Sequence, residues 1–306
     1  MTTVLADVLN VDWQTLVDAI GLGAVYALMA VGIGLIFGVL RLVNFAYGQL
    51  IMAGAYALAL ASEWDWPAWA GIALCFAVVI ALSLAMERVV FRPLREQPPA
   101  VMLVATFAVA FLLQSIALLW FGPLGKPVTS FVSLNRPISI GDVDIRRITV
   151  VAIVVAAACL LALMLLLGRT TIGLHMRAAA LDFRTARLLG VRANRVIGSA
   201  VLISGLLAAV VAVILTVQTS FVTPGFALSE TIVVLAGVVL GGMNRLFSAT
   251  LGGFAIGFAS GLLGGALPTA QSQYLSSFLF GLVIVVLLIR PGGLFTRPGA
   301  QVVERA

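Results

Sequence analysis

A series of long apolar segments, separated by short stretches that carry almost all of the charge, constrains this chain more than any other feature. A helix needs about 20 residues to cross the hydrocarbon core of a bilayer, and a helix satisfies all of its own backbone hydrogen bonds there. Because 62% of the residues are hydrophobic and 10% are charged, against about 25% charged in soluble domains, we predict one all-α, polytopic membrane helix bundle over residues 1–306. The segments run at about 17–40, 45–61, 67–87, 100–121, 148–167, 196–220, 230–243, 246–267 and 273–289.

The number of spans is nine if every apolar segment crosses the membrane, with eight and ten as alternatives. Segment 230–243 is short, and segments 45–61 and 273–289 are at the lower limit of a spanning length. The glycines at 241–242, followed by Asn244, predict that segment 230–243 is a broken or re-entrant helix.

The distribution of basic residues predicts the orientation. Residues 168–195 contain a dense group of the chain's eighteen Lys and Arg residues and lie between two uncharged segments. An arginine at the bilayer centre costs roughly 2.5–3.5 kcal/mol, so this stretch lies outside the hydrocarbon, and the positive-inside rule places it in the cytoplasm. The N-terminal stretch before the first span has two acids and no base. We therefore expect no cleaved signal peptide, an outside N-terminus and an odd number of spans. The basic residues left outside are Lys126, Arg136, Arg146 and Arg147.

Two further patterns concern the loops and the packing of the helices. The outer loop, about 122–147, contains VTSFV and ISIGDVDI, whose weak alternation predicts a short β-hairpin. Glycines recur four residues apart, which places them on one helix face and lets helix backbones approach closely. We expect ordinary close packing at these faces, with a sliding gate as the alternative. The pairs are Gly34 with Gly38, Gly253 with Gly257, and Gly257 with Gly261.

Between their ends, the apolar segments contain no charged residue and no histidine. Ion-coupled carriers keep acids or histidines inside the membrane, whereas Asp18, Glu87 and Glu230 all lie at segment ends. The single lysine, Lys126, precedes proline and not the Ser or Thr of a P-loop, so the chain does not hydrolyse ATP by that route. No cluster of acids, cysteines or histidines predicts a catalytic or metal site. The basic residues lie in short loops, which argues against nucleic-acid binding.

The cytoplasmic stretch 168–195 has the pattern of a short amphipathic helix. Read as a helix over 174–189, it places Leu174, Leu181 and Leu188 on one stripe, and Gly190 then allows a left-handed turn. Its arginines could meet a soluble partner or the headgroups of membrane lipid, and the spacing does not choose between these. Energy must then come through contact with another protein.

The same stretch resembles a known family. Gly173, Arg177-Ala178, Asp182, Ala186 and Gly190 are similar to the cytosolic coupling segment in the permeases of branched-chain amino acid ABC importers, the LivH type. The resemblance extends in order through GLGAVYALMAVGIGLIFGVLRLVNFAYGQLIMAGAY at 21–56, ERVVFRPLR at 87–95, VVLGG at 238–242 and RPGGLF at 290–295. This chain differs from the family at Tyr47, where His is common, and in MNRLFSATLGG after the VVLGG sequence.

The resemblance implies an importer in a bacterial cytoplasmic (inner) membrane. Its expected partners are a second permease, LivM-like or a copy of this chain, two cytosolic ATPase subunits, and a periplasmic substrate-binding protein. It also implies that this chain has no cofactor, since the partner subunits use the ATP. The residues that the resemblance assigns to ATPase coupling are Gly173, Arg177, Ala178, Asp182, Ala186 and Gly190.

Polar residues at membrane depth are candidates for the translocation path, because an unpaired polar group is costly there. Asn44, Tyr47 and Gln49 rank first, and Thr106, Gln114 and Gln218 follow. Hydrogen bonds between helices would explain the same residues. We expect the substrate to be a branched-chain or related apolar amino acid. The alternative is a permease or stand-alone facilitator for urea or another small neutral solute, which explains the uncharged segments but not the 168–195 stretch.

Overall fold

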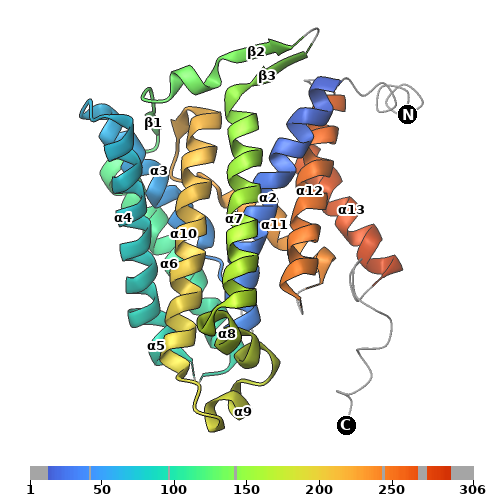
Figure 1. The fold of residues 1–306 in the computed structure, drawn as a ribbon. Coiled ribbons are helices and arrows are strands. Elements are labelled where there is room, and N and C mark those ends of the chain that lie inside the picture. The colour runs from blue at the N-terminus through green and yellow to red at the C-terminus, as the bar shows by residue number, and fades with distance from the viewer. Residues whose placement is uncertain are drawn as a thin grey trace.

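The computed structural model describes residues 13–40, 43–95, 97–140, 143–242, 245–267 and 274–290. These residues form an all-α bundle of roughly parallel and antiparallel helices, capped at one end by short strands and at the other by short helices (Figure 1). The predicted all-α polytopic fold is therefore confirmed.

Within the described residues, six helices are long and apolar enough to cross a membrane by length and composition. Three shorter helices accompany them: α3 (Tyr47–Glu63), α11 (Leu228–Gly241) and α13 (Leu275–Ile289). Together they coincide with all nine predicted apolar segments, although the number that cross the bilayer stays a prediction. The six are α2 (Trp13–Leu40), α4 (Ala68–Met86) with its continuation to Leu94, α6 (Pro99–Phe121), α7 (Arg147–Arg169), α10 (Ala193–Thr219) and α12 (Leu246–Ala266).

Short helices gather at one end of the bundle, opposite the strands (Figure 1). α4 continues through a π-helical turn, Glu87–Phe91, into α5 (Arg92–Leu94) at this end, and α8 (Thr171–Leu181) and α9 (Phe183–Leu188) lie beside it. α2 begins at the strand end, and α13 runs away from that end (Figure 1). We call the end with α5, α8 and α9 the cytoplasmic end, following the charge distribution.

The predicted outer hairpin is confirmed for one of its two sequences. In ISIGDVDI, β2 (Pro137–Ile140) pairs antiparallel with β3 (Val143–Arg146). VTSFV forms no strand; instead β1 (Lys126–Pro127) pairs antiparallel with β4 (Phe221–Val222), which follows α10. The alternation in VTSFV was too short to specify a partner, and the tertiary structure supplies a different pair from distant sequence.

The glycines of α12 set the distance between α12 and α2. A Cβ atom at Gly253, Gly257 or Gly261 would collide with Ala30, Tyr26 or Ala19 of α2, respectively. The expected close packing is present, because only glycine leaves room for the two backbones at this separation. On α2 itself the prediction fails at Gly38, where a Cβ atom would meet nothing within 4 Å.

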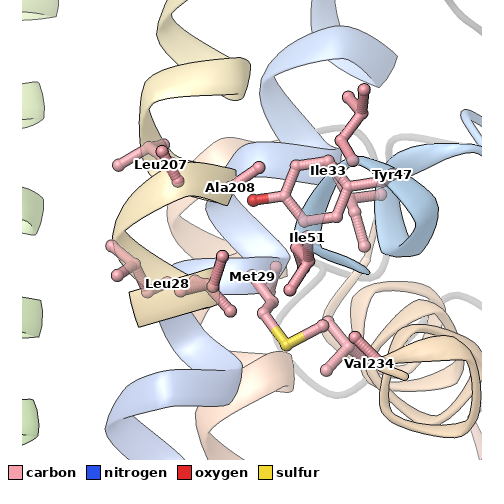
Figure 2. Packing of buried hydrophobic residues seen from close by; sticks show 14 of the residues in the cluster. Leu28, Met29, Ile33, Tyr47, Ile51, Leu207, Ala208 and Val234 are labelled. Carbon is pink, nitrogen blue, oxygen red and sulfur yellow. The ribbon is translucent and has the colours of Figure 1, made fainter. Parts of the chain in front are cut away.

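The core lies where α2, α3, α10 and α11 meet. Figure 2 shows Met29 of α2, Ile51 of α3 and Val234 of α11 pointing into one cluster, with Ala208 of α10 nearby. All four side chains are almost completely buried. α2 is thus a central helix surrounded by protein, whereas α6 and α7 expose much of their surface.

The break predicted within segment 230–243 is absent from Leu228–Gly241, which is one continuous helix, and a re-entrant course stays a prediction. α11 has 14 residues and ends at Gly241, and Gly242 follows with a φ of 101°, a conformation that favours glycine. At its other end, α11 follows a turn in which Ala227 has a φ of 61°. Asn244, which formed part of the same prediction, lies outside the described residues, as do Arg41, Arg297 and Arg305.

Candidate functional site

The first candidate site is the junction between α2 and α3. α2 ends at Leu40, Val43 to Ala46 are not helical, and α3 begins at Tyr47. The Asn44 Oδ1 atom accepts a hydrogen bond from the Ala46 backbone N–H at 3.1 Å. Such a local side-chain bond competes with helix continuation and favours a turn. Asn44, Tyr47 and Gln49 are all completely buried.

Several polar atoms at this junction have no hydrogen-bond partner. They are Nδ2 of Asn44, the hydroxyl of Tyr47, and both amide atoms of Gln49. Moving an amide from water into an apolar environment without a hydrogen bond costs roughly 2–7 kcal/mol. The structure therefore places uncompensated polar groups where a passing solute, water or a second protein chain would satisfy them.

Gln49 lies beside a cavity of about 340 Å³ between α3, α6 and α11. Gln114 of α6 lines the same cavity, so the structure brings together two of the path residues predicted from the sequence. Thr231 of α11 is a third polar lining residue. The apolar lining residues are Phe45, Phe107, Ala110, Phe111, Leu228 and Ile232.

The sequence prediction missed Thr231. Its hydroxyl donates to the Ala227 carbonyl at 2.6 Å, and a Cβ atom on Gly48 would lie 2.5 Å from the same hydroxyl oxygen. Gly48 therefore permits the first turn of α3 to touch the first turn of α11. The signal in the sequence was a hydroxyl residue near the start of a short, interrupted apolar segment, beside Glu230.

Thr106 and Tyr47 lie close to this junction but do not line the cavity. The Thr106 hydroxyl donates to the Leu103 carbonyl at 2.9 Å and accepts from the Phe45 N–H at 3.4 Å, which ties α6 to the linker before α3. The Tyr47 ring instead lies in the core and directs its hydroxyl towards α10 near Ala208 (Figure 2). A Cβ atom on Gly32 would collide with that ring, so the ring is wedged against α2.

Gln218 is separate from the other predicted path residues. It lies one residue before the end of α10, next to Val217, whose carbonyl accepts a hydrogen bond from Asn135 of the outer loop. It does not line the cavity that contains Gln49 and Gln114. Counting polar residues along apolar segments could not reveal the depth at which each residue lies.

The second candidate site is the pair of short helices α8 and α9. The Thr170 hydroxyl accepts a hydrogen bond from the Gly173 N–H at 3.1 Å and so caps the start of α8. A Cβ atom on Gly173 would collide with the backbone of Leu167, which shows how closely α8 turns back over the end of α7. The buried side chains of Met176 and Ala179 hold α8 against the bundle.

The single helix predicted over 174–189 is wrong, because the structure divides it at Asp182. Asp182 has an extended backbone and accepts a hydrogen bond from the Thr185 N–H at 3.1 Å, so it starts α9. Ala186 is buried, and Gly190 turns the chain towards α10 with a φ of 91°. The apolar stripe favours one continuous helix, but Asp182 caps the start of a new helix, and the helix therefore breaks at this position.

The outer face of α8 and α9 presents large apolar side chains to solvent. Leu181, Leu188 and Leu189 are each more than 80% exposed. Arg177 is exposed as well, and it also lines a cavity of about 470 Å³ with Gly38 of α2 and Leu246 of α12. We call Arg177, Leu181, Leu188 and Leu189 the cytoplasmic surface.

Neither site has the residues of a metal centre. Within the described part of the chain, no group of three or more His, Cys, Asp and Glu side chains could hold a metal ion. Both sites depend instead on neutral polar groups, apolar surface and one arginine.

Comparison with known proteins agrees with a transport role. Residues 15–288 match the family model for the branched-chain amino acid transport system permease component. The chain is 31% identical to the high-affinity branched-chain amino acid transport system permease protein BraD of Pseudomonas aeruginosa, over 94% of this chain and 97% of BraD. It is 28% identical to the corresponding permease protein LivH of Escherichia coli (strain K12), over 94% of this chain and 96% of LivH.

A solved structure described as an inward-facing metal-chelate type ABC transporter covers 95% of this chain and 91% of its own, with a TM-score of 0.51. At 17% sequence identity, this match shows likeness of fold alone. The relatives do not favour the urea alternative, and the family is one of transport proteins, not enzymes. The chain is therefore a multi-pass membrane protein that belongs to the family of permease components of branched-chain amino acid transport systems.

Proposed function

We propose that this chain is the membrane-spanning subunit of an ABC importer that moves branched-chain or related apolar amino acids into the bacterial cytoplasm across the inner membrane. Separate ATPase subunits drive the movement, and this chain itself uses no cofactor. The observation that carries the proposal is the cytoplasmic surface, a set of exposed leucines and one arginine on short helices that are locked to the bundle.

The exposed leucines support docking of a protein rather than contact with water. Leu181, Leu188 and Leu189 leave a large apolar area uncovered at the cytoplasmic end, and exposed apolar patches mark interaction surfaces. Arg177 adds a charge beside them. A partner that covers this surface would move α8 and α9 as a rigid unit, because Gly173 and Ala186 fix both helices closely.

Gln49 and Gln114 support a path for an uncharged or zwitterionic solute. Their carboxamides can donate and accept hydrogen bonds, and the surrounding Phe45, Phe107 and Phe111 offer apolar walls for an aliphatic side chain. Phe107, Phe111 and Ile232 remain partly exposed at the edge of the cavity. We place the second permease, LivM-like or a copy of this chain, against this edge, so that the path lies between two chains.

The remaining partners follow from the two ends of the bundle. Two ATPase subunits would occupy the cytoplasmic surfaces of the paired permeases. A periplasmic binding protein would deliver the amino acid to the end that carries the β2–β3 hairpin and the β1–β4 pair. Membrane lipid would cover the exposed faces of α6 and α7.

A matched pair of leucine variants tests the proposal. Leu188 on α9 and Leu124 in the outer loop are 84% and 86% exposed, so neither substitution disturbs the core. We expect Leu188→Glu to lower the initial rate of radiolabelled leucine uptake at least tenfold in cells that express the full transport system, because a carboxylate would be buried in the ATPase interface. Leu124→Glu should leave uptake within twofold of the parent.

Co-purification of the tagged ATPase with each variant separates docking from other causes. Loss of the ATPase with Leu188→Glu, at equal amounts of permease in the membrane, is the expected result. Normal uptake and normal ATPase recovery with Leu188→Glu would show that the cytoplasmic surface is not the docking site.

A further inference from the structure

Another cavity at the cytoplasmic end borders the start of α8 but contains none of the residues of the cytoplasmic surface. It has a volume of about 660 Å³ and lies between the end of α4 and the starts of α8 and α10. Figure 1 shows these three helices side by side at this end of the bundle. Its lining residues are Leu84, Thr171, Ile172, His175, Gly190, Arg192, Asn194, Arg195, Val196, Gly198, Ser199 and Leu202.

The charged groups of this cavity are all basic. Arg192 and Arg195 are exposed at its rim, and the imidazole of His175 lies with them. Arg95 donates a hydrogen bond to Asn194 Oδ1, which holds another guanidinium beside the same rim. No acidic residue lines the cavity. Its electrostatic character therefore favours an anion.

The deeper wall is apolar and belongs to helices that enter the membrane. Leu84 near the end of α4 is 43% exposed, and Val196 and Leu202 are on α10. At 1.5 Å per residue, Leu202 lies about 12 Å further along the helix than Asn194. The cavity thus has basic groups near the start of α10 and apolar side chains further along it, which matches the order of headgroup and acyl chains in a phospholipid.

We propose that this cavity binds an anionic phospholipid. The lipid phosphate lies between Arg192 and Arg195, and the upper part of an acyl chain lies along Leu84 and Leu202. Basic pockets between helices on the cytoplasmic side of a membrane protein suit such headgroups. A free phosphate would meet the same arginines but would leave the apolar wall unfilled.

Gly198 provides a way to test the cavity separately from its charge. It lies on α10 within the cavity lining, and a Cβ atom there would meet nothing within 4 Å. Gly198→Leu therefore adds an apolar side chain to the cavity, keeps both arginines, and replaces a glycine inside a helix with a residue of better helix propensity.

The test measures retained lipid by native mass spectrometry. The purified full-length chain is equilibrated in detergent with equal amounts of phosphatidylglycerol and phosphatidylcholine. We expect preferential retention of phosphatidylglycerol by the parent, and at least a fivefold loss in both Gly198→Leu and the double variant Arg192→Gln with Arg195→Gln. The double variant Arg146→Gln with Arg147→Gln removes two exposed arginines at the opposite end and should retain the lipid.

Three results would overturn the proposal. Equal retention of the two lipids by the parent would show no preference for an anion. Normal retention by either the Arg192 and Arg195 variant or Gly198→Leu would place the lipid elsewhere. Displacement of phosphatidylglycerol by millimolar inorganic phosphate would identify a free-anion site. Elution profiles and melting temperatures equal to the parent exclude misfolding, and a variant that fails this check is replaced by Arg192→Gln alone under the same criteria.

Discussion

Two regions of the molecule differ in their packing. Glycines bring α2 and α12 into close contact, whereas leucines are exposed on the cytoplasmic surface at α8 and α9. At the first, Gly253, Gly257 and Gly261 bring two backbones together and leave no space for even a methyl group. At the second, Leu181 and Leu188 extend into solvent with no intramolecular partner for most of their surface. One region is complete within this chain, whereas the other leaves large apolar side chains uncovered by the described part of the chain.

This difference indicates how force could pass through the molecule. α8 packs directly against α2, so a push on α8 would reach the helix that forms the tight interface with α12. Closely packed helices shift as rigid bodies because their interfaces do not deform continuously. Substitutions in the tight interface should therefore damage folding, whereas substitutions in the cytoplasmic surface should damage transport alone.

The largest effect is expected from Gly257→Val. A Cβ atom at Gly257 would lie 2.7 Å from the Tyr26 Cβ and 2.8 Å from the Gly23 Cα, and overpacking of this kind costs about 1–3 kcal/mol or more. We expect little folded protein by fluorescence-detected size-exclusion chromatography. Gly38→Val is the matched control, since the same side chain meets open space there. Equal yields from the two variants would refute the tight interface.

The next effect is a loss of uptake without a loss of protein. Gly190 has a φ of 91°, whereas proline fixes φ near −65°, so Gly190→Pro should misdirect the chain between α9 and α10. Arg177→Glu reverses the charge of the cytoplasmic surface. We expect both variants to insert normally and to reduce leucine uptake to background, as measured with labelled leucine and membrane immunoblots. Unchanged uptake in both would contradict docking at α8 and α9.

The smallest effect is expected from a substitution at Gln49. The direction of the change in melting temperature decides whether Gln49 lines a path or forms a hydrogen bond between helices. Gln49→Leu removes both unpartnered amide atoms, so the melting temperature should rise by the equivalent of about 1–3 kcal/mol, while the KM for leucine uptake rises severalfold. Gln218→Leu, near the outer end of α10, should change neither quantity. A lower melting temperature with normal uptake for Gln49→Leu would instead indicate a hydrogen bond between helices.

Much of the fold could be read from local sequence. All nine predicted apolar segments coincide with helices in the described residues, and α11 ends at Gly241, one of the two glycines that the sequence singled out. In lipid the backbone must satisfy its own hydrogen bonds, so a sufficiently long apolar segment has few alternatives to a helix. The basic residues then orient the bundle, because charge is excluded from the hydrocarbon.

The candidate sites were less predictable, and the reason is the range of the interactions involved. Polarity ranked Gln49 above Gln114 and Gln218 and did not separate the latter two, but the packing of α3, α6 and α11 brings Gln49 and Gln114 to one cavity and adds Thr231. Likewise, the apolar stripe over 174–189 is a local property, and the division at Asp182 depends on a competing cap and on how α8 folds back over α7. Sequence determined the helices and the family, since these follow from hydropathy and motif, and its charge distribution predicts the orientation. Tertiary structure alone decided which polar groups share a cavity and which leucines stay uncovered, since both depend on neighbours from distant parts of the chain.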